Sequence, residues 1–328
     1  MTTTKSSLRD VLEALKNGQS FVLAAHVNPD GDAIGSMLSL AALLKSMGKD
    51  AVCVTDEPPP GDLGFLPGIN TILSPAQAAK RSYDTAIILD VSTLDRAGKS
   101  AQAFPKHAPL IVIDHHIEPA PEGQLNFVDT SYAATAEIVL ELFDLAGVSL
   151  SYEVALCAYT AIVTDTGGFK YPSTTGRTHR LTARLLDEGI DPGEIAGRVF
   201  DSMSLGRFRL ITRAFSKLTL TGNGRIAYTV VTGQDMDETG AKSEDLNNLG
   251  NHGRNIEGVD VSVVFRELEP RRTKVSFRSQ KTFNSAECLQ HFGGGGHTGA
   301  AAAVVDLPLD ETVRNVLTHV RACMGLEQ

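Results

Sequence analysis

Short apolar runs alternate with longer amphipathic segments along the first half of the chain. Four runs have the length and composition of buried strands: Phe21–Ala25, Ala51–Val54, Ala86–Leu89 and Leu110–Ile113. Helical patterns follow them over Ala33–Met47, Ala133–Ala146 and Tyr152–Val163. This alternation is typical of an α/β domain with a mostly parallel, doubly wound sheet covered on both faces. Ligands of such sheets bind beyond the carboxyl ends of the strands.

The pattern changes in the second half. Residues from about 178 to 215 are helical and charged, without strand signals. Beyond them we predict strands at Lys217–Leu220, Arg225–Val231, Val259–Leu268, Thr273–Arg278 and through Val304, with helices at Ser285–His291 and Glu311–Cys323. The chain is therefore predicted to contain an α/β domain over residues 1–187, a helical linker over 188–216, and a smaller mixed-sheet α/β domain over 217–328.

Composition narrows the class of protein. The 328 residues are 42% hydrophobic and 21% charged, which is a normal globular balance. The net charge of −9 argues against a broad basic surface for long nucleic acid. No apolar run approaches the ~20 residues that span a bilayer, so we expect no membrane partner. Cys53, Cys157, Cys288 and Cys323 form no CxxC pair, which argues against a zinc cluster or disulfide framework and favours a cytoplasmic protein.

Carboxylates and imidazoles follow the predicted strands of the first half. A buried cluster of such groups is costly unless something pairs with the charges. Taken singly, each of these residues could be an ordinary turn or cap residue. Their joint placement at successive strand ends favours a metal site instead. The candidates are His26, Asp30 and Asp32 after the first strand, Asp90 after the third, Asp114, His115 and His116 after the fourth, and Asp165 after the apolar stretch Ala158–Val163.

The chemistry of this donor set indicates the kind of metal. Oxygen and imidazole donors without thiolates favour Mn²⁺ or a similar ion over structural zinc. The candidates outnumber the ligands of one tetrahedral ion and suit two ions that share a carboxylate. Two such ions can activate water and stabilise an in-line displacement at phosphorus. The residues alone thus predict hydrolysis of phosphate esters.

The same residues resemble a known family. HVNPDGDAIGS, Asp90 within ILDVS, the Asp114-His115-His116 triplet and DTGGF are similar, in order and spacing, to the four motifs of the DHH phosphoesterases. VSFRS followed by GGGGH resembles the DHH-associated C-terminal domain. Within the family, the chain looks most like the NrnA-type nano-RNases and 3′-phosphoadenosine 5′-phosphate phosphatases. The resemblance covers nearly the whole sequence.

The resemblance implies a role for each candidate. His26 and Asp30 would hold a first Mn²⁺, and Asp32, His115 and Asp165 a second, with Asp90 bridging the two. Mg²⁺ or Co²⁺ could substitute for Mn²⁺. His116 would face the substrate phosphate and assist the leaving oxygen as a general acid. Asp114 would orient a neighbouring histidine.

The resemblance also implies a substrate site in the smaller domain. Its residues would be Arg278, Ser279, Gly294, Gly295, Gly296 and His297. The guanidinium of Arg278 suits phosphate because it can donate two hydrogen bonds at once. Glycines let a phosphate approach backbone N–H groups, although the run alone is equally consistent with a flexible turn. The family pattern has glycine where Ala302 stands here, which affects the local backbone and not the metal site.

The resemblance also implies the reaction, and we expect the active site in a cleft between the two domains. We expect hydrolysis of short oligoribonucleotides to mononucleotides, and of 3′-phosphoadenosine 5′-phosphate to AMP. Three alternatives stay open: a phosphodiesterase of cyclic dinucleotides or their linear products, an inorganic pyrophosphatase, and a catalytically silent nucleotide-binding regulator. Partners would be short RNA or small nucleotides, not long nucleic acid, and a homodimer is left open.

Overall fold

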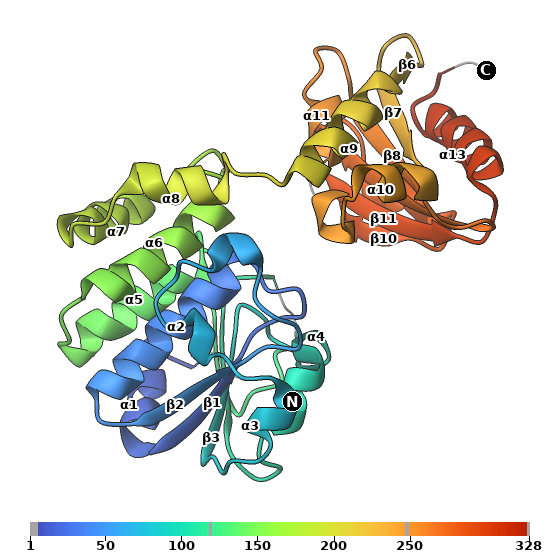
Figure 1. Cartoon of the computed structure of the whole chain (residues 1–328). Helices are drawn as coiled ribbons and strands as arrows, with labels where there is room; N and C mark the ends of the chain where they lie inside the picture. Colours follow the sequence, from blue (N-terminus) through green and yellow to red (C-terminus); the bar gives the residue numbers. More distant parts are fainter. Residues whose placement is uncertain (1–5, 118–119, 247–248, 327–328) are drawn as a thin grey trace. The chain divides into compact units, whose positions relative to one another are not determined.

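The computed structural model describes residues 6–117, 120–246 and 249–326. They form two compact units, which divide between Ser202 and Met203 (Figure 1). This point falls inside the predicted helical linker, 188–216. Within the described part of the chain, every helix is too short or too polar to span a lipid bilayer.

Five parallel strands form the sheet of the first unit, in the order β2-β1-β3-β4-β5. They are β1 (Ser20–Ala24), β2 (Asp50–Val54), β3 (Thr85–Leu89), β4 (Leu110–Asp114) and β5 (Leu125–Val128). The four predicted strands and the doubly wound order are thereby confirmed. The pattern missed β5, because its four residues follow a stretch rich in proline and glycine. The strand order reverses between β1 and β3, which is where sheets of this kind bind ligands.

Helices cover both faces of this sheet because alternate strand residues point to opposite sides. Phe21 and Leu23 pack under the helices of one face, whereas Val22 packs against the other. The first face carries α1 (Leu8–Asn17), α2 (Gly31–Ser46), α5 (Thr135–Ala146) and α6 (Tyr152–Asp165). The second carries α3 (Pro75–Ala78), α4 (Leu94–Ala97) and the 3₁₀ helix η3 (Gly98–Ala103). Two further 3₁₀ turns are η1 (Gly61–Leu63) and η2 (Ile69–Thr71).

Helices α2 and α6 cross at very short range, which fixes the elements that carry the site. A Cβ atom on Gly35 would lie 2.4 Å from the carbonyl oxygen of Cys157. Only glycine allows this approach. The contact holds α6 against α2, and the donor atoms of Asp32 on α2 and Asp165 on α6 lie within 4.8 Å of each other.

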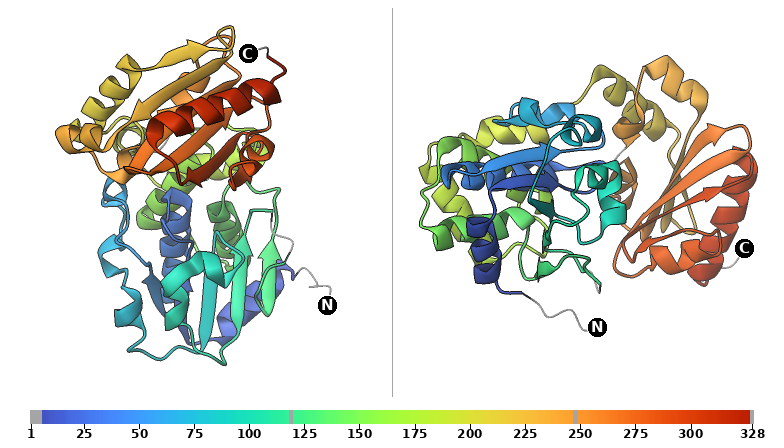
Figure 2. Two further views of the ribbon diagram at one scale, coloured as in Figure 1. Left: turned by 90° about the vertical axis from the view of Figure 1, so that its right-hand side faces the viewer. Right: turned by 90° about the horizontal axis from the view of Figure 1, so that it is seen from below.

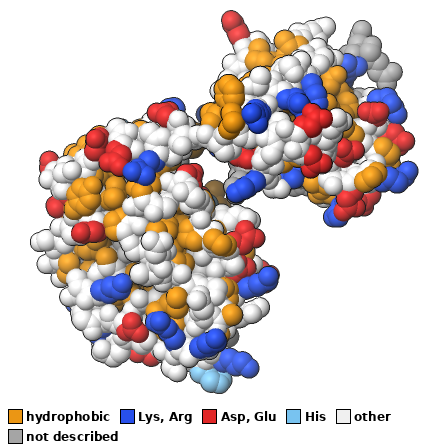
Figure 3. Space-filling model, in the orientation of Figure 1, with side chains coloured by type: hydrophobic (Ala, Val, Ile, Leu, Met, Phe, Trp, Pro, Cys, Tyr) orange, Lys and Arg blue, Asp and Glu red, His pale blue; other side chains and the backbone are white. Residues whose placement is uncertain are grey.

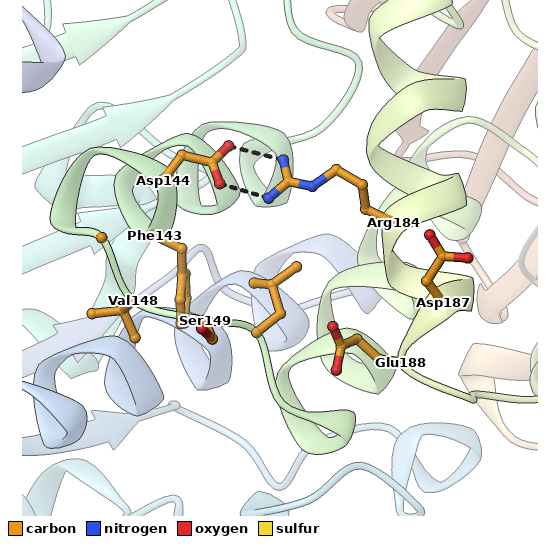
Figure 4. A pocket seen from close by; sticks show the side chains of 9 residues that line it. Phe143, Asp144, Val148, Ser149, Arg184, Asp187 and Glu188 are labelled. Carbon is orange, nitrogen blue, oxygen red and sulfur yellow. Dashed lines mark hydrogen bonds and ion pairs between the residues drawn. The ribbon is translucent and has the colours of Figure 1, made fainter.

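Two more helices complete the first unit, α7 (Gly176–Asp187) and α8 (Pro192–Val199). Arg184 of α7 donates to both carboxylate oxygens of Asp144 on α5, over 2.8 and 2.5 Å. This ion pair borders an open hollow of about 440 Å³, which Asp187 and Glu188 also line (Figure 4). Because both partners are close to half exposed, we expect the pair to contribute no more than ~1 kcal/mol.

The second unit has a six-stranded mixed sheet in the order β10-β11-β9-β8-β7-β6. Its strands are β6 (Thr219–Thr221), β7 (Ile226–Val231), β8 (Val261–Glu269), β9 (Arg272–Ser279), β10 (Gly295–His297) and β11 (Ala300–Val305). β7 and β8 pair in parallel, and the other neighbouring strands in this order pair antiparallel. The predicted strands are found, and the glycine run adds β10, a short strand at the sheet edge.

Helices again cover both faces of the sheet. The helices α12 (Ser285–Gln290) and α13 (Leu309–Cys323) pack over Val261, Val263 and Phe265. Figure 2 shows α13 lying along this face. The opposite face carries α9 (Leu205–Ser216), α10 (Gly233–Thr239), α11 (Leu249–Arg254) and the 3₁₀ turn η4 (Ser243–Leu246). The predicted linker therefore supplies α8 to the first unit and α9 to the second.

Candidate metal centre

The folded first unit brings the predicted metal ligands together at one edge of its sheet. The ligands form three donor sets. Each residue of a set offers one ligand atom, and these atoms all lie within 4.8 Å of one another. The segments after β1, β3 and β4 deliver His26, Asp90, His115 and His116. Asp30 caps the N-terminus of α2, Asp32 lies in the first turn of α2, and Asp165 is the last residue of α6. The sets are His26, Asp30 and Asp90; Asp32, His115 and Asp165; and Asp90, His115 and His116.

The first set is centred on His26. Its Nε2 lies 3.9 Å from an oxygen of Asp30 and 3.4 Å from an oxygen of Asp90. Its Nδ1 lies 2.9 Å from the carbonyl oxygen of Val27, to which it can donate. That hydrogen bond leaves the Nε2 lone pair available for a metal, which is the usual arrangement of a ligating histidine.

The second set is centred on His115. Its Nε2 lies 3.8, 3.4 and 3.4 Å from oxygens of Asp32, Asp90 and Asp165. This buried nitrogen has no hydrogen-bond partner among the described residues. Its Nδ1 faces the carbonyl oxygen of Tyr132 at 3.2 Å. A buried nitrogen without a partner, surrounded by carboxylates, fits a divalent cation.

Asp90 lies between the two sets. One of its oxygens faces His26 and the other faces His115, each at 3.4 Å. The residue is almost fully buried and has a φ of 61°, in the left-handed region that non-glycine residues seldom adopt. Thr135 donates its hydroxyl to Asp90 over 3.0 Å. A strained residue held in this way is typical of a functional site.

The N-terminal end of α5 holds Asp32 in place. The buried carboxylate accepts backbone N–H groups from Thr135 (2.6 Å) and Ala136 (3.0 Å), and the hydroxyl of Ser36 (2.8 Å). Free N–H groups at a helix start stabilise negative charge. The sequence pattern did not identify Thr135, since a threonine at a helix start is usually only a cap.

The close packing of acids and imidazoles changes their pKa values. Burial lowers the pKa of His115, but neighbouring Asp90, Asp32 and Asp165 outweigh it and raise the value to about 10. For His26, Asp30 and Asp90 likewise outweigh burial and raise the pKa to about 10. Burial and the charges of Asp90 and Asp165 raise the pKa of Asp32 well above its usual range. Without metal, the cluster therefore holds protons that a cation would replace.

Metal binding should accordingly release protons. Because their pKa values are raised to about 10, we expect the imidazoles of His26 and His115 to carry protons at pH 7.5 without metal, whereas a ligating nitrogen must be neutral. We expect at least two protons, one from each imidazole, to be released when Mn²⁺ fills the centre, and the apparent affinity for Mn²⁺ to rise with pH between 6 and 8. Calorimetry in two buffers of different ionisation enthalpy measures this number. Binding heats that do not depend on the buffer would contradict it.

His116 and Asp114 form a separate pair at the edge of the cluster. Asp114 is buried and accepts both the backbone N–H (3.0 Å) and Nδ1 (2.8 Å) of His116, and Ser92 donates to its other oxygen over 2.5 Å. The hydrogen bond that His116 donates to Asp114 raises the pKa of His116. The side chain of His116 is 40% exposed, and its Nε2 is available to a bound molecule because Nδ1 makes the contact with Asp114.

Arg177 supports the centre from α7, and the sequence pattern did not identify it. Its guanidinium stacks 3.8 Å above the ring of Tyr132 and donates to the carbonyl oxygen of Ser131. The same loop presents the Tyr132 carbonyl to His115.

Replacing Arg177 should therefore loosen the loop that orients His115. We expect Arg177→Ala to weaken Mn²⁺ binding roughly 10- to 100-fold, which is typical when groups behind a ligand are lost. Isothermal titration of the metal-free protein measures the change. Arg180→Ala, an exposed arginine on the same helix, is the matched control. Equal affinities for the two variants would remove Arg177 from the support of the centre.

The second unit contains the predicted substrate residues. Arg278, half-buried on β9, donates to the Phe277 carbonyl over 3.0 Å. The hydroxyl of Ser279 is buried within hydrogen-bond distance of Phe283, Thr298 and Ser285. Ser279 therefore holds the turn after β10 in place, and its side chain is not free to meet a ligand.

The glycine run has a structural requirement of its own. A Cβ on Gly294 would lie 2.7 Å from the carbonyl oxygen of Ala302, and one on Gly296 would lie 2.5 Å from that of Ala300. Gly296 also has a φ of 141°. Gly295 and His297 are exposed at the sheet edge, so this strand can present backbone groups to a ligand. Ala302, at the family's glycine position, pairs with Gly295 and points its methyl group to solvent.

Comparison with known proteins decides the family. Residues 20–162 match the DHH family, N-terminal domain, and residues 223–325 match the DHHA1 domain. A Thermus thermophilus protein named bifunctional oligoribonuclease and PAP phosphatase NrnA is 37% identical over 318 residues, which cover 96% of this chain and 93% of that protein. The chain is a DHH-family protein of the NrnA type. The resemblance in its motifs is thereby confirmed.

Further relatives agree with this assignment. A Bacillus subtilis protein of the same name is 26% identical to this DHH-family protein, over 90% of the chain and 92% of the relative. The solved structure of an exopolyphosphatase-related protein from Bacteroides fragilis matches with a TM-score of 0.89 and 27% identity, over 96% of this chain and 95% of the other. DHH phosphoesterases depend on metal ions, and the Asp and His clusters of this member have donors that fit divalent cations.

Proposed function

We propose that this DHH-family protein is a two-metal phosphoesterase. It hydrolyses short oligoribonucleotides to mononucleotides and removes the 3′-phosphate from 3′-phosphoadenosine 5′-phosphate. The observation that carries the proposal is the filled set of donor positions around Asp90, in a chain that aligns over 96% of its length with a relative named for these two activities. A catalytically silent regulator would be expected to lack some of these donors.

Two Mn²⁺ ions are the proposed cofactors. His26, Asp30 and Asp90 would hold one ion, and Asp32, Asp90, His115 and Asp165 the other, because these are the two donor sets on either side of Asp90. Carboxylate and imidazole donors suit Mn²⁺, with Mg²⁺ and Co²⁺ as substitutes. When bound, the pair would supply an activated water and neutralise charge on the reacting phosphate.

The protein's own residues then position the substrate and move a proton. His116 is the proposed general acid, since Asp114 fixes its ring, raises its pKa and leaves Nε2 free. Asp114 is the proposed positioning residue. It lies behind His116, with both oxygens already hydrogen-bonded.

The proposed preference for short substrates rests on charge as well as on the relatives' names. In Figure 3, basic side chains on the visible faces of both units are scattered between acidic ones. With a net charge of −9, the protein offers a long phosphate backbone little continuous attraction. Arg278, Gly294, Gly295, Gly296 and His297 are the proposed contacts for the nucleotide, and Ser279 positions them. We also propose a cytoplasmic location, where such nucleotides occur.

Arg278 should contribute to binding more than to the chemical step, because the metal ligands all lie in the first unit. We expect Arg278→Ala to raise KM for the dinucleotide pApA about tenfold or more, with a smaller change in kcat. Steady-state kinetics measure both parameters, with Arg272→Ala at the exposed start of the same strand as the control. Unchanged KM would remove Arg278 from the substrate site.

A side-by-side hydrolysis assay with Mn²⁺ tests the proposed substrates. The set comprises pApA, 3′-phosphoadenosine 5′-phosphate, cyclic di-AMP, pyrophosphate and a long single-stranded RNA. Fast cleavage of the first two, with the long RNA nearly untouched, is the expected result. Preferred turnover of cyclic di-AMP or pyrophosphate would overturn the substrate but keep the metal chemistry. No hydrolysis of any of them by metal-loaded protein would favour the regulator.

A further inference from the structure

The second unit contains a cluster of thiols and imidazoles that the proposed reaction does not use. Cys288 is buried on α12, and Cys323 is the last residue of α13. Their sulfur atoms lie 2.9 Å apart. His319, one turn earlier on α13, completes a set whose ligand atoms all lie within 4.8 Å of one another.

The sequence gives no sign of this cluster until the two helices are packed. Cys288 and Cys323 are 35 positions apart and belong to no CxxC pair. On the helices, however, Cys288 and His291 are spaced by three and His319 and Cys323 by four, which puts each pair on one side. The chain therefore carries a Cys-x₂-His pattern, which begins on α12 and ends at its C-cap His291, and a His-x₃-Cys pattern on α13.

We propose that Cys288, His319 and Cys323 form a structural zinc site that joins α12 to α13. Two thiolates and an imidazole are three of the four donors of a structural Cys₂His₂ zinc site. A buried thiolate is costly without a cation, so a bound metal ion would stabilise Cys288 as the thiolate, which is the form that binds metal. Sulfurs on one tetrahedral zinc lie roughly 3.8 Å apart, given Zn–S bonds of ~2.3 Å. The thiols would therefore separate by less than ~1 Å, and exposed Cys323 has room to move.

His291 is the nearest candidate for the fourth ligand. Its ring stacks on that of His319, with centroids 4.3 Å apart and planes inclined by 15°. Nearly parallel rings cannot both direct an in-plane lone pair at one ion, so His291 would have to rotate, which its exposed position permits. A disulfide between Cys288 and Cys323 is the rival use of the two sulfurs. The two imidazoles beside them favour metal, because a disulfide requires neither.

Co²⁺ spectroscopy separates this site from the Asp and His centre of the first unit. Thiolate-to-cobalt charge transfer can arise only where cysteine binds the ion, and the Asp and His centre contains no cysteine. The full chain, reduced and stripped of metal, should develop this absorption with three equivalents of Co²⁺, enough for both centres, and lose it when Zn²⁺ is added. Cys288→Ser and Cys323→Ser should lack the absorption. Cys157→Ala, which removes a thiol of the first unit, should retain it.

Two readouts keep the proposal falsifiable if a variant folds poorly. Zn²⁺ should raise the thermal midpoint of the unaltered chain by several degrees and protect the exposed Cys323 from alkylation. Hydrolysis by Cys323→Ser with Mn²⁺ should match that of the unaltered chain. Absence of the charge-transfer absorption in the reduced chain would overturn the proposal. A second result would also overturn it. If protein purified without reductant contains no zinc and only two titratable thiols, the two sulfurs form a disulfide.

Discussion

Asp90→Ala is expected to reduce turnover of pApA by about three orders of magnitude. Asp90 is the residue whose two oxygens face different donor sets, each 3.4 Å from a histidine Nε2. Its loss should remove at least one bound ion and several kcal/mol of transition-state stabilisation, and each ~1.4 kcal/mol corresponds to a factor of ten in rate. The measurement combines kcat with elemental analysis of bound Mn²⁺.

Two controls make the Asp90→Ala result interpretable. Asp62→Ala removes an exposed carboxylate in η1 and should leave both turnover and metal content unchanged. Circular dichroism checks that the Asp90 variant is folded, since the change also removes a charge that repels Asp32. A folded Asp90→Ala protein that binds two ions and turns over normally would disprove the shared-carboxylate assignment.

His116→Gln should have the second-largest effect, with the opposite outcome for metal. Loss of a positioned general acid slows a reaction by about 10²- to 10⁴-fold. The donor sets on both sides of Asp90 retain their other ligands, so two Mn²⁺ ions should still bind. The pH profile of the remaining activity should lose the fall in rate that accompanies deprotonation of the His116 imidazolium. Asp114 raises the pKa of this group.

The same two measurements, turnover and metal content, test His116. His107→Gln, which changes an exposed histidine outside the cluster, should behave like the unaltered protein. If His116→Gln loses an ion, the histidine is a ligand and not an acid. If it retains both ions and full turnover across the pH range, another group protonates the leaving oxygen.

Much of the first unit could be predicted because its signals are local. Buried parallel strands appear as continuous apolar runs, so β1 to β4 were found within a residue of their bounds, and their order along the chain placed His26, Asp90 and His115 at one edge. β5 was missed because four residues carry little periodicity. Asp165 was identified as a donor, but its position at the end of α6 depends on the α2–α6 contact through Gly35.

The groups that support the ligands could not be predicted, because contacts distant in sequence create them. Thr135 lies 103 positions from Asp32, and Arg177 lies 46 positions from Ser131. Neither residue belongs to a motif. The Cys288–Cys323 pair is a similar case, since sequence spacing argued against any thiol cluster and only the packing of α12 on α13 brings the sulfurs together.

The most direct test of the account is hydrolysis of pApA as a function of the Mn²⁺ ions bound to the first unit's centre. The full chain is stripped of metal, its thiol cluster is filled with one equivalent of Zn²⁺, and Mn²⁺ is then titrated while bound metal and initial rate are measured together. Activity should appear as the second Mn²⁺ binds, and a long RNA should stay intact throughout. Full activity with one Mn²⁺, or with none, would contradict the two-metal proposal.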